Sequence, residues 1–189
     1  MEHHAAMPAT AGVIRLDTEI SLDPVSLEDA PALYACIDRN RERLREWLPW
    51  VTPEYTIEHT RRFLADRARE HADRLALTCV IRTRGEIAGA ISLHWIDQTH
   101  RATSIGYWID GAFAGQGIMT RACRAIVDAG FRDYGLHRIE IRCAAGNHRS
   151  CAIPRRLGFT EEGLLREAQW LFNRWVDLRV FGMLEHEWR

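Results

Sequence analysis

The sequence predicts an α/β (α+β) domain built on a mixed, mostly antiparallel sheet of about seven strands with about four helices. Segments that alternate apolar and polar residues, as half-buried strands do, occur near both ends and in the middle of the chain. Segments with apolar residues at helical spacing separate them. The resulting order is strand, two helices, three strands, helix, strand, helix and two strands, which is typical of a sheet covered by helices.

The first elements lie between residues 14 and 73. Residues 14–22 alternate apolar and polar side chains and predict one strand. Ser26 is a typical helix N-cap, and Asp29 follows three residues later, so we expect a helix to begin there. Two prolines in "LPWVTP" end that helix, and residues 57–73 predict a second, highly charged helix.

Strands dominate the middle of the chain. Residues 75–81 and 87–96 flank a turn that contains Gly85, which predicts a hairpin. Residues 102–109 predict a third strand, and a helix with a stripe of small side chains is expected to begin near Gln116.

The C-terminal third repeats these patterns. Ile139, Ile141 and Cys143 alternate in a strand, and "GNHRSCAIPRRLGF" predicts a short helix that ends at Gly158. Two strand-like segments follow, joined by a turn near Asn173.

Length and composition predict a globular protein. The 189 residues are 47% hydrophobic and 27% charged, which suits one domain over residues 13–189 after a loose segment of residues 1 to about 12. The net charge is −1, so neither nucleic acid nor an anionic membrane is expected as a partner. There is no lysine: all the basic residues are arginines.

Cysteine usage and hydropathy predict a cytoplasmic location. The five cysteines form no CxxC pair, which favours neither a disulfide framework nor a zinc site, so no metal is expected. Free cysteines fit a reducing compartment. No apolar run approaches the roughly 18 residues of a membrane span, and the N-terminal segment lacks the order of a signal peptide.

The segment "FAGQGIMTRA" places Gly115 and Gly117 between a strand and a helix. The unpaired N–H groups and the dipole of a helix N-terminus favour an anion, and glycines let a phosphate approach the backbone closely. A tight strand-to-helix corner without a ligand explains the same glycines. From these residues alone, both interpretations stay open.

With its surroundings, this segment resembles the GNAT superfamily of acyl-CoA-dependent N-acetyltransferases. The resemblance lies in "IGYWIDGAFAGQGIMTRA", followed by N-x-x-S and "LGF". "NRERLREWLPW" and "EEGLLREAQWLFNRWVDLRVF" are similar to the RimJ/RimL-type branch, which acetylates ribosomal proteins. The family turn Q/R-x-x-G-x-G/A matches at both glycines, while Ala112 replaces its leading residue. The resemblance extends from about Arg15 to Leu184.

The resemblance implies acetyl-CoA as co-substrate and assigns its binding residues. Backbone groups near Trp108 and Ile109 would bind the pantetheine arm, and Asn147 would lie beside the arm and the thioester. The N–H groups that would receive the phosphates belong to one run: Gly115, Gln116, Gly117, Ile118, Met119 and Thr120. Ser150 is the candidate proton donor to the departing thiolate. Both Asn147 and Ser150 are also explained as residues of a helix cap.

The general base is the unusual position. This branch commonly carries a glutamate where the present chain has Gln169, which cannot accept a proton. Glu167 lies two residues earlier, on the same strand face by the period of two, and is the candidate substitute. Glu167 is also explained as a solvated strand carboxylate without a catalytic role. An α-amine, with a pKa of about 8, needs a strong base less than lysine does.

The predicted function is transfer of an acetyl group from acetyl-CoA to a primary amine by direct attack in a ternary complex. A protein N-terminal α-amine is the favoured acceptor. Three further functions stay open: acetylation of a small-molecule amine such as an antibiotic or polyamine, transfer of a succinyl-type acyl group, and non-catalytic sensing of acyl-CoA. The resemblance also implies a homodimer, with the apolar C-terminal strands as a candidate interface. Three further side chains, Trp47, Trp50 and His94, either border the acceptor cleft or are ordinary packing and surface residues.

Overall fold

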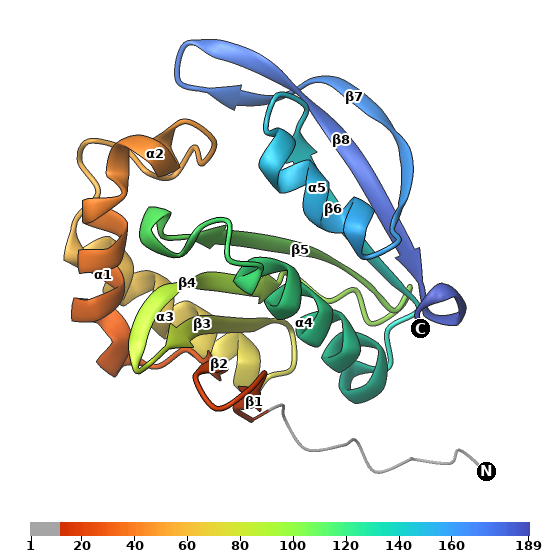
Figure 1. The fold of residues 1–189 in the computed structure, drawn as a ribbon, viewed down its shortest axis with the longest axis horizontal. Coiled ribbons are helices and arrows are strands. Elements are labelled where there is room, and N and C mark those ends of the chain that lie inside the picture. Colours follow the sequence, from red (N-terminus) through yellow and green to blue (C-terminus); the bar gives the residue numbers. More distant parts are fainter. Residues whose placement is uncertain (1–11) are drawn as a thin grey trace.

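A computed structural model describes residues 12–189 (Figure 1). The segment expected to be loose, residues 1 to about 12, lies outside the described residues except for Gly12. The described chain forms an eight-stranded sheet in the order β1-β2-β3-β4-β5-β6-β8-β7. Its strands are β1 (Ile14–Arg15), β2 (Ile20–Pro24), β3 (Leu77–Thr83), β4 (Glu86–Leu93), β5 (Ala102–Ile109), β6 (Arg138–Ala144), β7 (Thr160–Leu171) and β8 (Arg174–Leu184). Among these described strands only β5 and β6 pair in parallel, so the predicted mixed, mostly antiparallel sheet is confirmed, with one more strand than expected.

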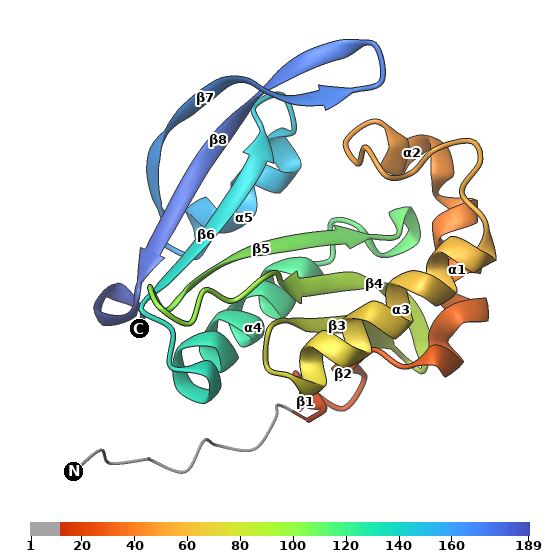
Figure 2. The ribbon, with the colours of Figure 1, turned by 180° about the vertical axis from the view of Figure 1, so that it is seen from behind.

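Helices cover both faces of the sheet (Figures 1 and 2). They are α1 (Ala30–Arg39), α2 (Arg41–Arg45), α3 (Ile57–Ala72), α4 (Ile118–Tyr134) and α5 (His148–Arg156). Side chains of α1 and α3 form one apolar core with one face, and α4 and α5 form the larger core with the other. Among residues 12–189, no helix has the length and apolar character needed to cross a membrane.

The two N-terminal predictions differ from the structure for local reasons. Residues 14–22 form two short strands instead of one, because the Asp17 carboxylate accepts hydrogen bonds from the N–H groups of Glu19 and Ile20, both at 2.7 Å. The cap at Ser26 and Asp29 is present. The expected long helix, however, is divided at Asn40 into α1 and α2.

The sheet divides between β5 and β6. These strands pair only from Ala102 opposite Arg138 to Ile105 opposite Ile141. Beyond that point β5 stays paired with β4, and β6 stays paired with β8. Figure 1 shows β6, with the long β7–β8 hairpin, turning away from β5. We call the region beside β5 after Ile105 the notch.

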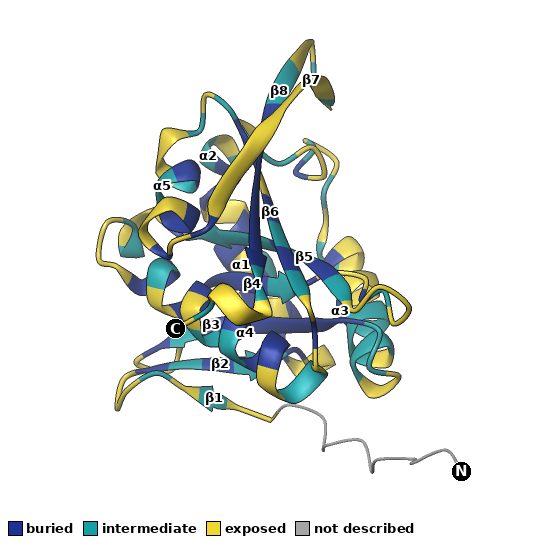
Figure 3. Ribbon diagram, turned by 90° about the vertical axis from the view of Figure 1, so that its right-hand side faces the viewer, coloured by how far each residue is buried: buried dark blue, intermediate teal, exposed yellow. Residues whose placement is uncertain are grey.

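The β7–β8 hairpin forms the far edge of the sheet. Figure 3 shows β7 exposed along most of its length. Its exposed side chains include large apolar ones: Leu164, Leu165 and Trp170 on β7 and Trp175 on β8.

Candidate functional site

The backbone of β5 offers free hydrogen-bonding groups to the notch. Two backbone hydrogen bonds show which residues of this segment pair toward β4. His94 N donates to Ser104 O at 2.8 Å, and Asp110 N donates to Ala88 O at 2.7 Å. Bonded and non-bonded pairs alternate in an antiparallel ladder, so Trp108 also bonds to β4. Tyr107 and Ile109 therefore direct their N–H and C=O groups toward the notch. The resemblance implies backbone ligands near Trp108 and Ile109. Of these two residues only Ile109 directs its backbone groups toward the notch, and Tyr107, next to Trp108, does so as well.

The junction of α1 and α2 grips the end of β5. Arg43 donates from Nη1 to the carbonyl of Ile109 at 2.5 Å. Arg39 donates to the Asp110 carboxylate at 2.6 Å, and the Asn40 side-chain oxygen accepts from the N–H of Gly111 at 2.9 Å. The carbonyl of Ile109 is therefore paired with Arg43, and the N–H group of Ile109 remains free toward the notch.

Asp110 is the buried anchor of this junction. Burial alone would raise the pKa of its carboxyl, but hydrogen bonds from the Ala112 N–H, Arg39 and Asn40 outweigh burial, so its pKa is lowered. A carboxylate that is ionised at neutral pH therefore holds the end of the strand. The next loop residues, which begin the glycine turn, start from this fixed point.

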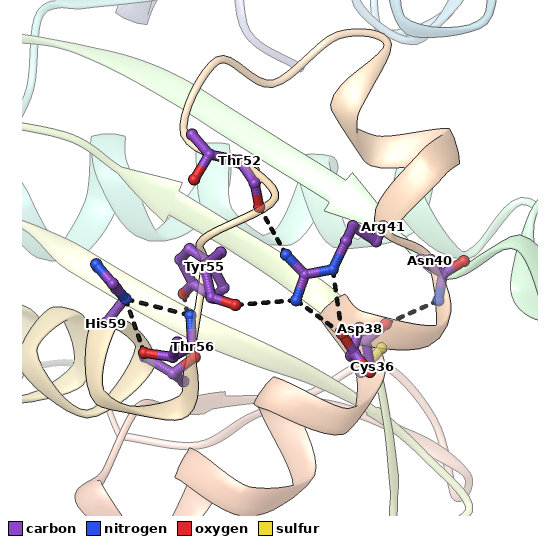
Figure 4. A network of polar contacts seen from close by, with 9 residues as sticks. Cys36, Asp38, Asn40, Arg41, Thr52, Tyr55, Thr56 and His59 are labelled. Atoms are coloured by element: carbon purple, nitrogen blue, oxygen red, sulfur yellow. Dashed lines mark hydrogen bonds and ion pairs between the residues drawn. The ribbon is translucent and has the colours of Figure 1, made fainter.

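A second network fixes the loop that follows α2 (Figure 4). Arg41 donates to the carbonyls of Thr52 at 2.6 Å and Tyr55 at 2.9 Å, and to the Asp38 carboxylate at 2.7 Å. One guanidinium joins the end of α1 to the segment before α3. The loop between α2 and α3, on the side of the molecule that faces the tip of the β7–β8 hairpin, is therefore held in place.

The glycine turn has the form expected of an anion cradle. Gly115 and Gly117 have φ values of +80° and +75°, and a Cβ at either position would meet no atom within 4 Å. Gly117 caps α4, a helix of 17 residues. Within residues 12–189, no backbone N–H from Gly115 to Thr120 donates to a protein acceptor. This run adds unpaired donors to the positive end of a long helix, which suits a phosphate group.

The side chains of this run are arranged so that the backbone faces outward. Ile118 and Met119 are buried in the core beneath, and Thr120 is half-buried. The Gln116 side chain donates to the carbonyl of Ala112 at 3.0 Å and so closes the loop from its exposed side. The predicted phosphate-binding residues are thus contiguous in space as well as in sequence.

Ser150 and Asn147 lie on α5, next to the notch. The Asn147 side chain caps the helix by accepting from the Ser150 N–H at 3.1 Å. The Ser150 hydroxyl lies 3.3 Å from the Tyr107 hydroxyl and 3.2 Å from the Cys143 sulfur. Tyr107 is also the residue whose backbone faces the notch, so Ser150 is placed beside the free edge of β5.

Neither neighbour of Ser150 is ionised at neutral pH. Burial raises the pKa of Tyr107 well above its ordinary value and the pKa of Cys143 to about 11. The cluster is therefore a set of neutral hydroxyl and thiol groups. Such groups can donate a proton or a hydrogen bond to an anion that forms beside them.

The segment of the candidate base departs from regular strand geometry. Between the pairs Leu165–Leu178 and Gln169–Val176, β7 contains extra residues. Glu167 lies in this bulge with φ +49°, and its N–H donates to the Asp177 carboxylate at 2.8 Å. The period of two is interrupted there, so it does not place Glu167 on the face of Gln169. Glu167 is exposed and Gln169 is half-buried.

The tip of the β7–β8 hairpin approaches α2. A surface depression of about 320 Å³ lies between them, lined by Arg45, Glu46 and residues 171–174. Arg45 lies 4.6 Å from the ring centre of Phe172. Trp47 stands beside this depression, 6.0 Å below the Arg174 guanidinium, and 3.6 Å from where a Cβ of Gly146 would lie. Trp50, by contrast, packs on Tyr55.

Two residues of the candidate site cannot be predicted from the sequence. Arg43 is one of several arginines in "RNRER", which has the pattern of a solvated helix face, and only the fold brings it to Ile109. Tyr107 alternates as an ordinary strand residue, and nothing in the sequence announces its contact with Ser150.

Comparisons with known proteins agree with this geometry. Residues 19–160 match the family model described as an acetyltransferase (GNAT) domain. A putative ribosomal N-acetyltransferase, YdaF, of Bacillus subtilis is 34% identical over 92% of this chain and 96% of its own length. The ribosomal-protein-serine acetyltransferase of Escherichia coli is 28% identical over 90% and 96%. Among solved structures, RimL, a ribosomal L7/L12 alpha-N-protein acetyltransferase in complex with coenzyme A, superposes with a TM-score of 0.88, at 29% identity over 91% of this chain and 97% of that one.

Proposed function

Because this chain belongs to the GNAT acetyltransferase family, we propose that it transfers an acetyl group from acetyl-CoA to the α-amine of a protein N-terminus. The two relatives and the solved structure named above are described as acetyltransferases of ribosomal proteins. A ribosomal protein is accordingly the first acceptor to test.

One observation carries the proposal: the free donors of the glycine turn continue into the free edge of β5. The unpaired N–H groups of residues 115–120 suit the pyrophosphate of acetyl-CoA. The free backbone groups of Tyr107 and the N–H of Ile109 suit an extended pantetheine arm that binds as an added strand. The thioester would then reach the part of the notch beside Ser150 and Asn147.

Few chemical parts are needed in this site. The neutral amine attacks the thioester carbonyl, and the C–S bond breaks as the tetrahedral intermediate collapses. Ser150 is the proposed donor of a proton or hydrogen bond to the departing thiolate. Holding the amine against the thioester supplies much of the acceleration.

The experiment measures thiol release from acetyl-CoA with a panel of acceptors. The panel contains peptides with free N-termini that begin with serine or alanine, the same peptides with blocked N-termini and an internal lysine, spermidine and an aminoglycoside. We expect release with the free N-terminal peptides and little with the blocked ones. Release only with spermidine or the aminoglycoside would replace the acceptor by a small amine.

Binding and turnover measurements distinguish an acetyltransferase from an acyl-CoA sensor and from a succinyl-type transferase. Tight acetyl-CoA binding without release on any acceptor would favour a non-catalytic sensor, and faster turnover of succinyl-CoA would favour a longer acyl group. Absence of acetyl-CoA binding in calorimetry would overturn the whole proposal.

We further propose that residues 13–189 act as one catalytic domain that works in the cytoplasm as a homodimer. All five cysteines are buried free thiols, which suits a reducing compartment. The exposed apolar residues of the β7–β8 hairpin supply a candidate dimer surface.

A further inference from the structure

The imidazole of His94 lies against Gly106 at the apex of the notch. A Cβ on Gly106 would stand 2.5 Å from both Cε1 and Nε2 of His94, so the ring covers this glycine directly. Gly106 follows Ile105, the last residue of β5 that pairs with β6. The ring is thus placed where the two strands begin to separate.

His94 and Ser150 approach the notch from opposite faces of the sheet. Side chains alternate along β5: Ile105 and Tyr107 pack into the core of α4 and α5, whereas Trp108 packs against the core of α1 and α3. Gly106 shares the face of Trp108, and His94 covers it there. Ser150 contacts Tyr107 from the other face.

The surroundings of His94 favour a neutral ring with one free nitrogen. Its Nδ1 lies 3.2 Å from the Ser104 hydroxyl. When Nδ1–H donates to Ser104, Nε2 keeps its lone pair. Desolvation by the surrounding protein, and then the charge of Arg67 on α3, lower the pKa of His94 below its ordinary value. The residue is still exposed and can exchange protons with solvent.

We propose that His94 is the residue that accepts the proton lost by the attacking amine. This inference rests on the proposed function. The amine nitrogen forms a bond to the thioester carbonyl carbon, and its proton passes to Nε2 of His94. The intermediate collapses, the C–S bond breaks, and the thiolate takes a proton from Ser150, which recovers one from water. His94 releases its proton to solvent, so one amine and one acetyl thioester give one amide and one thiol.

His94 would supply the proton acceptor that the chain lacks at Gln169. Glu167 is exposed, and its backbone is turned out of the strand by the bulge at φ +49°. His94 instead follows β4, and its ring covers Gly106 of β5, one residue beyond the last β5–β6 pair. It also stands across the sheet from the proposed thiolate donor, which separates the two proton transfers.

The test replaces His94 by glutamine, which can still bond to Ser104 but cannot take up a proton. We expect kcat of H94Q on a free N-terminal peptide to fall at least about 100-fold, the lower range for loss of a general base. The affinity for acetyl-CoA, measured by calorimetry, should stay unchanged. H100Q is the matched control: His100 is an exposed histidine in the loop before β5, and its replacement should leave kcat unchanged.

The pH profile distinguishes proton transfer from a packing role. In the wild type, both His94 and the amine must be deprotonated, so log kcat/KM should rise with a slope of about two below the pKa of His94. In H94Q only the amine titrates, so the slope should be about one. The slope of about two should persist in E167Q, and its kcat should equal that of the wild type.

A second variant covers a folding failure of H94Q. In G106A the new methyl group must displace the ring, so kcat should fall with the imidazole chemistry unchanged. Wild-type kcat and slope in H94Q, or in G106A where H94Q does not fold, would overturn the inference. A slope of about one in E167Q would assign the proton to Glu167 instead. If the wild type releases no thiol with any acceptor, the proposed function fails, whatever His94 does.

Discussion

Single backbone angles decide the glycine turn. At Gly117, φ is +75°, a conformation that costs other residues about 1–2 kcal/mol. A Cβ there meets no protein atom within 4 Å, so packing does not demand a glycine. The demand comes from the backbone angle and from whatever approaches the free N–H groups.

The first prediction follows from this residue. G117A should lower the free energy of unfolding by about 1 kcal/mol and should weaken acetyl-CoA binding at least about 10-fold, because the methyl group obstructs the phosphates and strain moves the donors. G135A is the matched control: Gly135 caps the other end of α4 with φ +60° and open space around it. It should lose similar stability and no affinity. Equal affinity loss in both variants would contradict the cradle.

The second prediction concerns Ser150. S150A removes the hydroxyl but keeps the N–H that bonds to Asn147, so the cap of α5 survives. We expect thiol release to slow about 10- to 100-fold with unchanged acetyl-CoA affinity. Stopped-flow detection of the thiol gives the rate, and calorimetry gives the affinity. A wild-type rate would remove Ser150 from the mechanism.

Among the elements, the junction of α1 and α2 supports the end of β5. Arg43 bonds to the carbonyl of Ile109, and Asp110 is held by Arg39. The helices on one face therefore control a strand end whose N–H groups face the notch.

The third prediction removes one of these supports. R43Q should cost about 1.5–3 kcal/mol of stability, the range for a hydrogen bond to a charged group. Amide exchange at Ile109 should accelerate, and KM for acetyl-CoA should rise. R62Q on the exposed side of α3 is the control and should change none of these. Unchanged exchange at Ile109 in R43Q would show that the junction does not brace the strand.

The elements also show which parts of the fold a sequence can predict. The strand over residues 102–109 and the helix over residues 57–72 were predictable because long periodic patterns specify them. The division of residues 14–22 and the bulge at Glu167 were not. Single carboxylates, Asp17 and Asp177, bind nearby backbone N–H groups there and override the alternation.

The site shows the same division. Short local motifs in the sequence indicate the glycine turn and Ser150 as candidate site residues. Arg43 and Tyr107 act through partners 66 and 43 residues away, and no local pattern reports such contacts.

On the scale of the whole molecule, the β7–β8 hairpin carries a group of exposed apolar side chains at the edge of the sheet. Trp170 and Trp175 are 49% and 56% exposed, and their rings pack edge to face at 5.0 Å. Large exposed aromatic pairs on an edge hairpin mark contact surfaces.

The fourth prediction tests the proposed homodimer on this surface. A W170S/W175S variant should elute as a monomer in size-exclusion chromatography with light scattering, while the wild type is a dimer. W95S is the control, since Trp95 is 63% exposed but lies two residues beyond the end of β4, away from the hairpin. A monomeric wild type would remove the dimer from the proposal.

The short pairing between β5 and β6 has a consequence for the way this protein opens. Strands between Ile14 and Ile109 build one side of the sheet, and strands from Arg138 to Leu184 build the other. In the described part of the chain only four residue pairs join the two sides within the sheet. Such a seam can part in a partial unfolding event well below the free energy of global unfolding. A ligand that contacts both sides holds them together. If it binds only the paired form, its binding adds to the free energy of this partial unfolding. Without a ligand, the two sides of the sheet would therefore separate and pair again repeatedly, and bound acetyl-CoA would make these openings rarer.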